Sequence, residues 1–246
     1  MLDAVSGERV ANALPQDVLY GLAASHLTSL VLDDCGEVLL ETHTANAFKA
    51  MAQAAKDDGI TLSICSAYRP FERQLAIWNA KAAGKRTLLD EHSRPVAFDT
   101  LSPERLLETI LLWSALPGAS RHHWGTDCDV FDASRIDKRQ LQLIDSEYQA
   151  DGVCGALSAW LDKHAARFGF YFPYQAGLSG TRPEPWHLSY FPIAAPLLAR
   201  FQTCDLRHVL ACNDVMLKST IETQLDALVE RYVRRVAPID WLYDNM

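Results

Sequence analysis

Residues 120–129 read SRHHWGTDCD, a stretch in which His122 precedes Asp129 by seven residues. Gly125 lies between them, and glycine favours tight turns. The residues after this glycine, 126–131, predict a short strand. Imidazole nitrogen and carboxylate oxygen both coordinate zinc at ~2.0–2.2 Å, and a loop that leads into a strand can aim both side chains at one ion. Two ligands alone do not make a metal site.

A third ligand is available in the later tetrapeptide EPWH, where Glu184 precedes His187 by three residues. A catalytic zinc site needs three protein ligands and one open position for water or substrate. His122, Asp129 and His187 would then bind the metal, and Glu184 would handle protons. By spacing alone, a group of polar surface residues without a metal fits the pattern equally well.

The chain upstream predicts a helix, a strand and a second helix in succession. Apolar residues recur at helical spacing over 44–56, and residues 60–65 then alternate between apolar and polar, which is typical of a half-buried strand. The strand ends near Arg69. A second helix starts at Phe71 and ends near Gly84.

Downstream, the elements alternate irregularly. A helix starts at Ser102, which can cap it, and ends at the dipeptide PG of residues 117–118. Residues 157–168 predict another helix and 168–172 another strand. Helices and strands mix without a regular βαβ alternation, which favours an α+β fold over a doubly wound one.

Three motifs in this order closely resemble the VanY-like D-alanyl-D-alanine carboxypeptidases, which are zinc peptidases related to the VanX-type dipeptidases. The motifs are Ser66-x-Tyr68-Arg69-x-x-x-x-Gln74, Ser120-x-His122-x-x-Gly125-x-x-x-Asp129 and Glu184-Pro185-Trp186-His187. The resemblance covers about residues 45–192. It implies an α+β fold with a small antiparallel sheet flanked by helices, the D-Ala-D-Ala carboxypeptidase/hedgehog-like zinc peptidase core.

Carried over by position, the resemblance assigns the chemistry to four residues. His122, Asp129 and His187 would bind Zn2+. Glu184 would be the catalytic base and acid for attack by a zinc-bound water, whose pKa falls to ~7 in such sites.

The resemblance also implies substrate contacts for Arg69, Ser120 and Gln74. A fixed cation such as Arg69 can stabilise the negative charge of the tetrahedral intermediate, or it can bind the terminal carboxylate of the substrate. Both roles stay open for Arg69.

This chain departs from the family pattern at Asp127, where the family usually has alanine. In a regular strand Asp127 and Asp129 point to the same face, because side chains alternate with period two. We expect Asp127 to accept a hydrogen bond from a ligand imidazole or from Arg69 and so to orient it. The alternative is direct ligation of the metal by Asp127. His123 is assigned a structural or rim position.

The expected domain organisation follows from these patterns. Residues 1–195 would form a zinc peptidase domain with its core at 45–192. Apolar residues at helical spacing from Leu217 to Tyr232 predict an amphipathic helix, so residues 196–246 would form a helical extension packed on that domain.

The implied activity is removal of D-alanine from peptidoglycan-type peptides, either a cell-wall precursor or a muropeptide. A peptidoglycan endopeptidase or an L,D-carboxypeptidase could use the same zinc site. A non-catalytic zinc-binding interaction module is a further alternative, although retention of Glu184 and Arg69 argues against it, because a structural site has no use for a base.

Composition limits the kinds of molecule that this protein is expected to bind. The net charge is -8 and the basic residues are scattered, which argues against nucleic acid as a partner. The six cysteines form no Cys-x-x-Cys pair, which argues against a zinc ribbon or a redox dithiol. No signal peptide or transmembrane segment is evident, so a cytoplasmic location is expected, with the periplasm or cell envelope as the alternative if a signal has been removed. The oligomeric state does not follow from the sequence.

Overall fold

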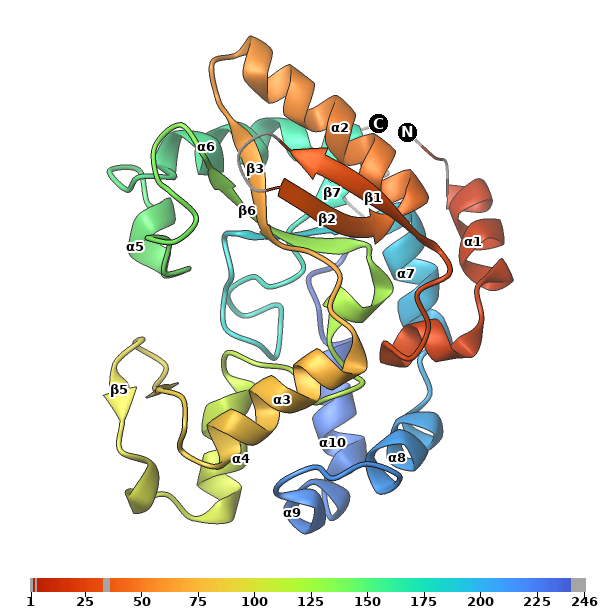
Figure 1. The fold of residues 1–246 in the computed structure, drawn as a ribbon, viewed down its shortest axis with the longest axis vertical. Helices are drawn as coiled ribbons and strands as arrows, with labels where there is room; N and C mark the ends of the chain where they lie inside the picture. The colour runs from red at the N-terminus through yellow and green to blue at the C-terminus, as the bar shows by residue number, and fades with distance from the viewer. Residues whose placement is uncertain (1, 3, 33–35, 240–246) are drawn as a thin grey trace.

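The structure, a computed structural model, describes residues 2, 4–32 and 36–239. A four-stranded antiparallel sheet in the order β3-β6-β8-β7 lies at its centre (Figure 1). The strands are β3 Leu62–Ser66, β6 Asp127–Asp132, β8 His187–Tyr190 and β7 Phe170–Tyr171. The expected α+β fold with a small antiparallel sheet is confirmed.

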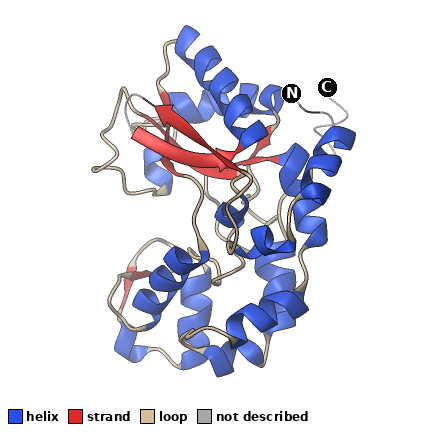
Figure 2. Cartoon of the chain, turned by 45° about the vertical axis from the view of Figure 1, so that its right-hand side comes forward, coloured by secondary structure: helices blue, strands red, loops and turns tan. Residues whose placement is uncertain are grey.

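The longer strands gather in one half of the molecule, the sheet half, while helices occur in both halves (Figure 2). The sheet half also holds α2 Thr42–Asp57, α5 Asp145–Tyr148, α6 Gly155–His164 and η4 Ala165–Phe168. The other half is built mainly from α3 Phe71–Ala82, α4 Pro103–Leu111 and the last helices of the chain. It also holds the two-residue strands β4 Leu88–Leu89 and β5 Pro95–Val96 and the turn η2 Phe98–Thr100.

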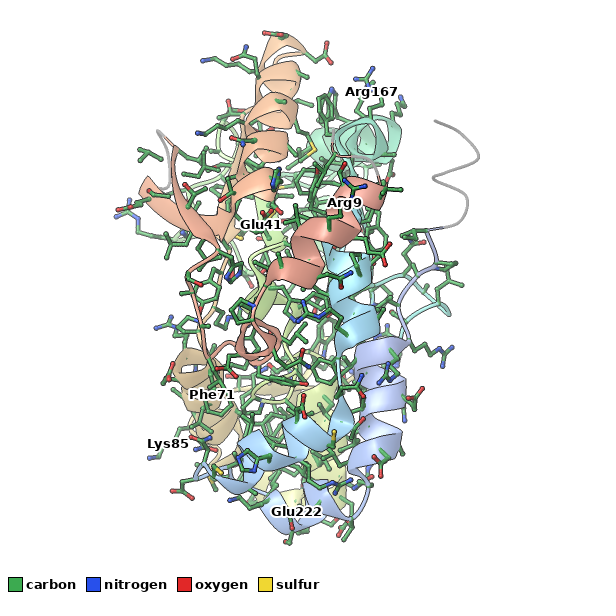
Figure 3. The ribbon with its side chains drawn as sticks, turned by 90° about the vertical axis from the view of Figure 1, so that its right-hand side faces the viewer. Arg9, Glu41, Phe71, Lys85, Arg167 and Glu222 are labelled. Atoms are coloured by element: carbon green, nitrogen blue, oxygen red, sulfur yellow. The ribbon has the colours of Figure 1, made fainter. Side chains whose placement is uncertain are left out.

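The N-terminal segment packs along one side of the sheet half. It comprises α1 Ala4–Ala13, η1 Gln16–Tyr20 and the hairpin of β1 Leu27–Leu32 and β2 Gly36–Glu41. Helix α1, which carries Arg9, lies against α7 Phe191–Arg200 (Figure 3). A Cβ on Gly7 would lie 2.0 Å from the carbonyl oxygen of Pro192, so glycine permits this close approach of the two helices.

The same N-terminal hairpin fixes the turn that precedes β6. The N–H of Glu41 donates to the carbonyl oxygen of Gly125 at 2.8 Å. Gly125 has a φ of +70°, and a Cβ on it would lie 2.5 Å from Cδ2 of Leu27 and 2.9 Å from the nitrogen of Glu41. Only glycine fits this turn, both by conformation and by space. The turn joins η3 Arg121–Trp124 to β6.

Most elements predicted between residues 45 and 192 are present within a few residues of their expected bounds. They include the strand that precedes Arg69 and the helix that follows it. The end of the helix that starts at Ser102 was predicted wrongly: α4 stops at Leu111, well before Pro117. The chain leaves the helix because the next residues bond to α3. The carbonyl oxygen of Ala115 accepts from Gln74, and Oγ of Ser114 accepts from Lys81.

The single amphipathic helix expected from Leu217 to Tyr232 is wrong as well. The chain forms α8 Thr203–Ala211, α9 Lys218–Glu222, α10 Leu225–Val229 and a π-helical turn, η5 Glu230–Arg234. The break between α9 and α10 has a local cause. The carbonyl oxygen of Thr220 accepts from the side chains of Thr223 and Gln224, which compete with the main-chain bond of a continuing helix.

The apolar side chains of these last helices belong to the same hydrophobic cluster as the sheet. Leu225, Val229 and Val233 are buried together with Val130 of β6 and Leu188 of β8. The boundary expected between residues 195 and 196 falls inside α7. Over the described ranges, every helix is too short or too polar to cross a bilayer.

We expect Gly125→Ala to destabilise the fold more than Gly59→Ala. Both glycines have positive φ, but a Cβ on Gly59 meets nothing within 4 Å. Gly59→Ala should therefore lower the free energy of unfolding only by the strain of an alanine in the left-handed conformation, about 1–2 kcal/mol. Gly125→Ala should add about 1–3 kcal/mol of overpacking. Urea unfolding followed by circular dichroism measures both, and equal losses would contradict the proposed close contact.

Candidate active site

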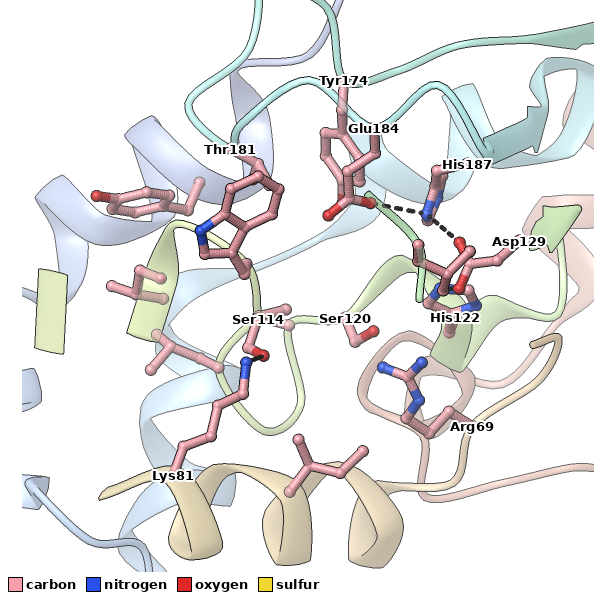
Figure 4. Close-up of a pocket in the computed structure, with 18 of the residues that line it drawn as sticks. Arg69, Lys81, Ser114, Ser120, His122, Asp129, Tyr174, Thr181, Glu184 and His187 are labelled. Carbon is pink, nitrogen blue, oxygen red and sulfur yellow. Dashed lines mark hydrogen bonds and ion pairs between the residues drawn. The ribbon is translucent and has the colours of Figure 1, made fainter. Parts of the chain in front are cut away.

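A cavity of about 320 Å³ opens between the sheet half and the helical half (Figure 4). Its wall at the sheet comes from η3, β6 and the start of β8. Its other walls come from α3, from the segment that follows α4, and from α10 and η5. Every site residue predicted from the sequence, apart from Gln74 and Asp127, lines this cavity.

The three residues expected to bind metal converge at one end of the cavity. His122 lies on η3, Asp129 on β6 and His187 on β8, and one potential ligand atom of each lies within 4.8 Å of the others. Nε2 of His122 is 3.4 Å from Oδ2 of Asp129, and Nδ1 of His187 is 3.1 Å from Oδ1 of Asp129. Ligand atoms around a tetrahedral zinc lie about 3.3 Å apart, so these separations suit one ion.

Strand pairing explains why two of these side chains meet. Asp129 of β6 stands directly opposite His187 of β8 in the antiparallel register. Side chains of directly opposed residues share one face of the sheet and lie close together. His122 comes from the loop just before β6, and the N–H of Arg69 donates to its carbonyl oxygen at 3.0 Å. Pairing of β6 with β8 thus brings the second and third motifs together, and the backbone bond between Arg69 and His122 joins the first motif to the second.

Hydrogen bonds fix the free nitrogen of each imidazole. Nδ1 of His122 lies 3.0 Å from the carbonyl oxygen of Ala67, which can only accept, so Nδ1 carries the proton and Nε2 has a free lone pair. Nε2 of His187 donates to Oδ1 of Asp127 at 3.0 Å, so Nδ1 is the nitrogen whose lone pair would be available to a metal. Both free nitrogens face Asp129, the arrangement in which an acceptor group orients a metal-binding histidine.

The charges around His187 fit a cation at this point. Oδ1 of Asp129 is buried and lacks a hydrogen-bond donor, and Oε2 of Glu184 lies 3.4 Å from Nδ1 of His187. Burial alone would lower the pKa of His187, yet the bond to Asp127 and the nearby carboxylates of Asp129 and Glu184 raise it well above its ordinary value. Burial would raise the pKa of Asp129, yet the nearby imidazoles, His122 first, lower it. A cation bound between these groups would satisfy the orphaned oxygen.

Asp127 is the centre of a buried ionic network behind His187. Nε of Arg121 donates to its Oδ1 at 2.8 Å, and the hydroxyl groups of Thr126 and Ser189 donate to Oδ2 at 2.7 and 3.2 Å. Burial alone would raise the pKa of Asp127, but the Arg121 charge and the bond from His187 lower it to about 2. Asp127 contacts His187 through Nε2, on the opposite side of the ring from the nitrogen that faces Asp129.

Arg121 is a buried residue beside the candidate site that the sequence analysis missed. Its side chain is 2% exposed, and it lies 4.7 Å from the ring centroid of Trp124 and donates to Ser189 as well as to Asp127. The sequence analysis expected Asp127 to accept from a ligand imidazole or from Arg69. The structure shows the bond from the His187 imidazole, and the cation beside Asp127 is Arg121 instead of Arg69. A signal did exist: an additional acid in a buried strand needs a partner cation, and Arg121 directly precedes His122.

Arg69 is held at the cavity by two side chains. Nη1 donates to Oε1 of Gln74 at 2.8 Å, and Nη2 donates to Oγ of Ser66 at 3.1 Å. Gln74 is buried, and its Nε2 donates to the carbonyl oxygen of Ala115. The amide of Gln74 thus bonds to the protein at both ends, which points to positioning of Arg69 and not to the substrate contact expected from the sequence. Ser120 lines the cavity between Arg69 and the opposite wall.

His123 connects two backbone segments, and both of its ring nitrogens are used in doing so, which leaves none for a metal ion. Its Nδ1 donates to the carbonyl oxygen of Arg69 at 2.6 Å, and its Nε2 accepts from the N–H of Gly118 at 3.1 Å. Burial lowers its pKa to about 3, so the imidazole is neutral. This matches the structural assignment made from the sequence.

The loop that carries Glu184 is anchored by the C-terminal segment. The N–H of Gly180 donates to the carbonyl oxygen of Arg235, and the N–H of Ala237 donates to that of Pro173. A Cβ on Gly180 would lie 1.7 Å from the carbonyl oxygen of Arg231, so the two backbones are in close contact. Tyr174 of this loop packs its ring 4.8 Å from that of His187. The sequence signalled neither the anchoring nor the role of Tyr174.

Comparison with known proteins identifies relatives of this chain. Residues 37–193 match the family model VanY, described as D-alanyl-D-alanine carboxypeptidase. An uncharacterised protein of Haemophilus influenzae is 31% identical over 121 residues, which cover 48% of this chain and 92% of that protein. A D-alanyl-D-alanine carboxypeptidase of Enterococcus faecalis is 28% identical over 148 residues, 58% of this chain and 44% of that protein.

A solved structure shares the fold. The structure described as VanYB in complex with D-Alanine-D-Alanine superposes with a TM-score of 0.50 and 22% sequence identity, covering 72% of this chain and 84% of that one. The segments beyond residue 193, which anchor the Glu184 loop, lie outside the family match.

We expect Arg121 and Asp127 to be strongly coupled in stability. Arg121→Met or Asp127→Ala alone leaves a buried charge without its partner and should cost about 3–5 kcal/mol. The double variant should cost clearly less than the sum of the two, as measured by urea unfolding. The exposed pair Arg105 and Glu108, at 2.7 Å, serves as the control and should show almost no coupling. Additive losses for Arg121 and Asp127 would contradict the ion pair.

Proposed function

Because the chain belongs to the VanY family of D-alanyl-D-alanine carboxypeptidases, we propose that it is a zinc-dependent peptidase that releases D-alanine from the end of peptidoglycan-type peptides. The observation that carries the proposal is the convergence of His122, Asp129 and His187 at the wall of a cavity that also exposes Glu184. Two imidazoles and one carboxylate, with a side open to the cavity, make the donor set of a catalytic zinc site.

The metal would be held by Nε2 of His122, Nδ1 of His187 and the carboxylate of Asp129. Zinc in such a site supplies Lewis acidity, which activates water and polarises a carbonyl group at neutral pH. The bonds from His122 to Ala67 and from His187 to Asp127 would hold both rings in the ligating tautomer.

Glu184 would handle the protons of the reaction. Its carboxylate is 13% exposed and lies 3.4 Å from Nδ1 of His187, so it faces both the ligands and the cavity. In this position it can take a proton from the attacking water and pass it to the nitrogen of the leaving amine. Tyr174 and Trp186 line the same cavity and add aromatic surface to its walls.

Arg69 would stabilise negative charge on the substrate. Ser66 and Gln74 each occupy one nitrogen of its guanidinium, so the group is oriented before the substrate arrives. A guanidinium fixed in a half-buried site binds a carboxylate or an oxyanion without the cost of reorganisation. Ser120 lies beside it in the cavity as a hydrogen-bonding group for the same substrate.

The VanYB relative was solved with D-Alanine-D-Alanine, which makes a peptide with this terminus the first substrate to test. We expect the purified protein to release a single D-alanine from a D-Ala-D-Ala-terminated pentapeptide, as detected by mass spectrometry. A chelator should abolish release and zinc should restore it. A peptide that ends in L-Ala-L-Ala is the control for stereochemistry. Cleavage of intact sacculi instead would indicate an endopeptidase, and zinc binding without any hydrolysis would indicate a non-catalytic module.

Glu184→Gln should separate chemistry from metal binding. The amide keeps the shape of the side chain but cannot take a proton, so we expect turnover to fall by about 10²–10⁴-fold. Zinc content, measured by elemental analysis, should stay at the wild-type level. Glu222→Gln, an exposed position at the end of α9, is the matched control and should retain full activity. Equal turnover of both variants would exclude Glu184 as the base.

A further inference from the structure

Lys81 lies in the last turn of α3 and lines the cavity away from the metal-binding residues. Its Nζ donates to Oγ of Ser114 at 2.6 Å. In Figure 4 Lys81 rises from α3 toward Ser114, while Arg69 and His122 lie across the cavity, with Ser120 between the two groups. The mechanism above makes no use of Lys81.

The charge of Lys81 has no partner acid in the part of the chain that the structure describes. The charged residues that line the cavity are Arg69, Lys81, Arg86, Asp129 and Glu184. Both acids belong to the metal end, where they lie within 3.4 Å of His187. The end around Lys81 and Arg86 is therefore cationic.

Burial makes this isolated ammonium group costly. Removal from water is the main cause that lowers the pKa of Lys81 to about 8; the positive charges of Arg86 and Arg69 act in the same direction, and Glu184 acts against them. Near neutral pH the group still carries its proton, since the pKa lies above 7. An anion that enters this site would restore the lost electrostatic stabilisation of the ammonium group.

We propose that Lys81 and Ser114 form a second anion subsite, which binds a carboxylate group of the peptide substrate away from the metal end. This inference rests on the proposed function, because it takes the ligand of the cavity to be a peptide. An ammonium group has three N–H donors, and only one is used by Ser114. The hydroxyl proton of Ser114 adds a further donor, so a carboxylate can bond to both side chains.

The walls of this end strengthen such a bond. Trp113, which directly precedes Ser114, lines the cavity together with Leu89 and Tyr232. Apolar walls lower the local dielectric constant, which strengthens a charge-assisted hydrogen bond relative to one in water. Ser120 separates this end from Arg69 in Figure 4, so the two cations can bind different groups of one peptide.

The carboxylate could be an acidic side chain of the peptide or its terminal carboxylate, and two sets of peptides separate these sources. The first set ends in D-Ala-D-Ala and carries a single glutamate, or glutamine in its place, at each of the three upstream positions in turn. The second set contains the free acid and the C-terminal amide of one neutral peptide. Each is assayed for kcat/KM with the wild type and with Lys81→Met, which removes the charge but keeps a long apolar side chain.

We expect Lys81→Met to lower kcat/KM by about 10- to 100-fold for one carboxylate peptide, the range for a lost bond to a charged group. The decrease in kcat/KM should be absent for the matched peptide in which glutamine or the C-terminal amide replaces that carboxylate. A loss confined to one glutamate position identifies a side-chain carboxylate, and a loss for the free acid but not for the amide identifies the terminal one. Lys85→Met, at an exposed lysine one turn later, should behave as the wild type. Equal effects of Lys81→Met on charged and neutral peptides, or no effect, would overturn the subsite.

Failure of the subsite and failure of the proposed function give different results. If the peptides are hydrolysed without dependence on Lys81, the subsite is wrong and the peptidase function stands. If none is hydrolysed, the same peptides are titrated calorimetrically into the zinc-loaded wild type and Lys81→Met proteins. A carboxylate preference in binding that requires Lys81 would then support the subsite, while the proposed catalysis would be wrong. Absence of that preference as well would overturn both.

Discussion

The antiparallel pairing of β6 with β8 is the constraint on which the site depends. It sets Asp129 opposite His187 and, two residues away, Asp127 opposite Ser189. A shift of the register by one residue would turn these side chains to the other face of the sheet. The pair of Arg121 and Asp127 lies at this point and bonds to both Ser189 and His187, so it bridges the loop, β6 and β8 within one network. A buried network of this kind is favourable only when nearly every polar atom has a partner, which ties the geometry of the ligands to the integrity of the whole sheet.

Charge is distributed along the cavity in a way that separates two tasks. Asp129, Glu184 and two imidazoles lie together at one end of the cavity. A cation bound there would accept their lone pairs and offset the negative charge of the two carboxylates. Three cationic side chains line the rest of the cavity: Arg69 from the loop before α3, Lys81 from α3, and Arg86 from the segment after it. Arg69 is oriented by neighbouring side chains, while Lys81 bonds, among the described residues, to the neutral hydroxyl group of Ser114 alone. Such an arrangement suits a ligand that places an electrophilic carbonyl group beside Asp129 and Glu184 and a negatively charged group beside the cationic side chains.

The C-terminal segment is part of the site as well as of the fold. Backbone bonds from Arg235 and Ala237 hold the loop that carries Tyr174 and Glu184, and Leu228, Tyr232 and Val233 line the cavity. These residues lie beyond the region that matches the family. This segment thus lines part of the cavity from outside the matched region, and a loop held by backbone bonds presents its side chains with little loss of entropy on binding.

The sequence by itself determined the family, the fold class and the residues that converge, because short motifs and the period of apolar residues are local properties of the chain. It predicted α2, α3, β3 and β6 within a few residues. It did not reveal that Arg121, and not Arg69, pairs with Asp127, nor that Gln74 orients Arg69. It also missed the early end of α4 and the break between α9 and α10. The break between α9 and α10 is local, because Thr223 and Gln224 bond to the carbonyl oxygen of Thr220, and the period of apolar residues carries no sign of it. Only tertiary structure decided the partners of Asp127 and Arg69 and the end of α4, since each depends on which partner a polar group finds once the chain is packed, and that choice leaves no periodic trace along the sequence.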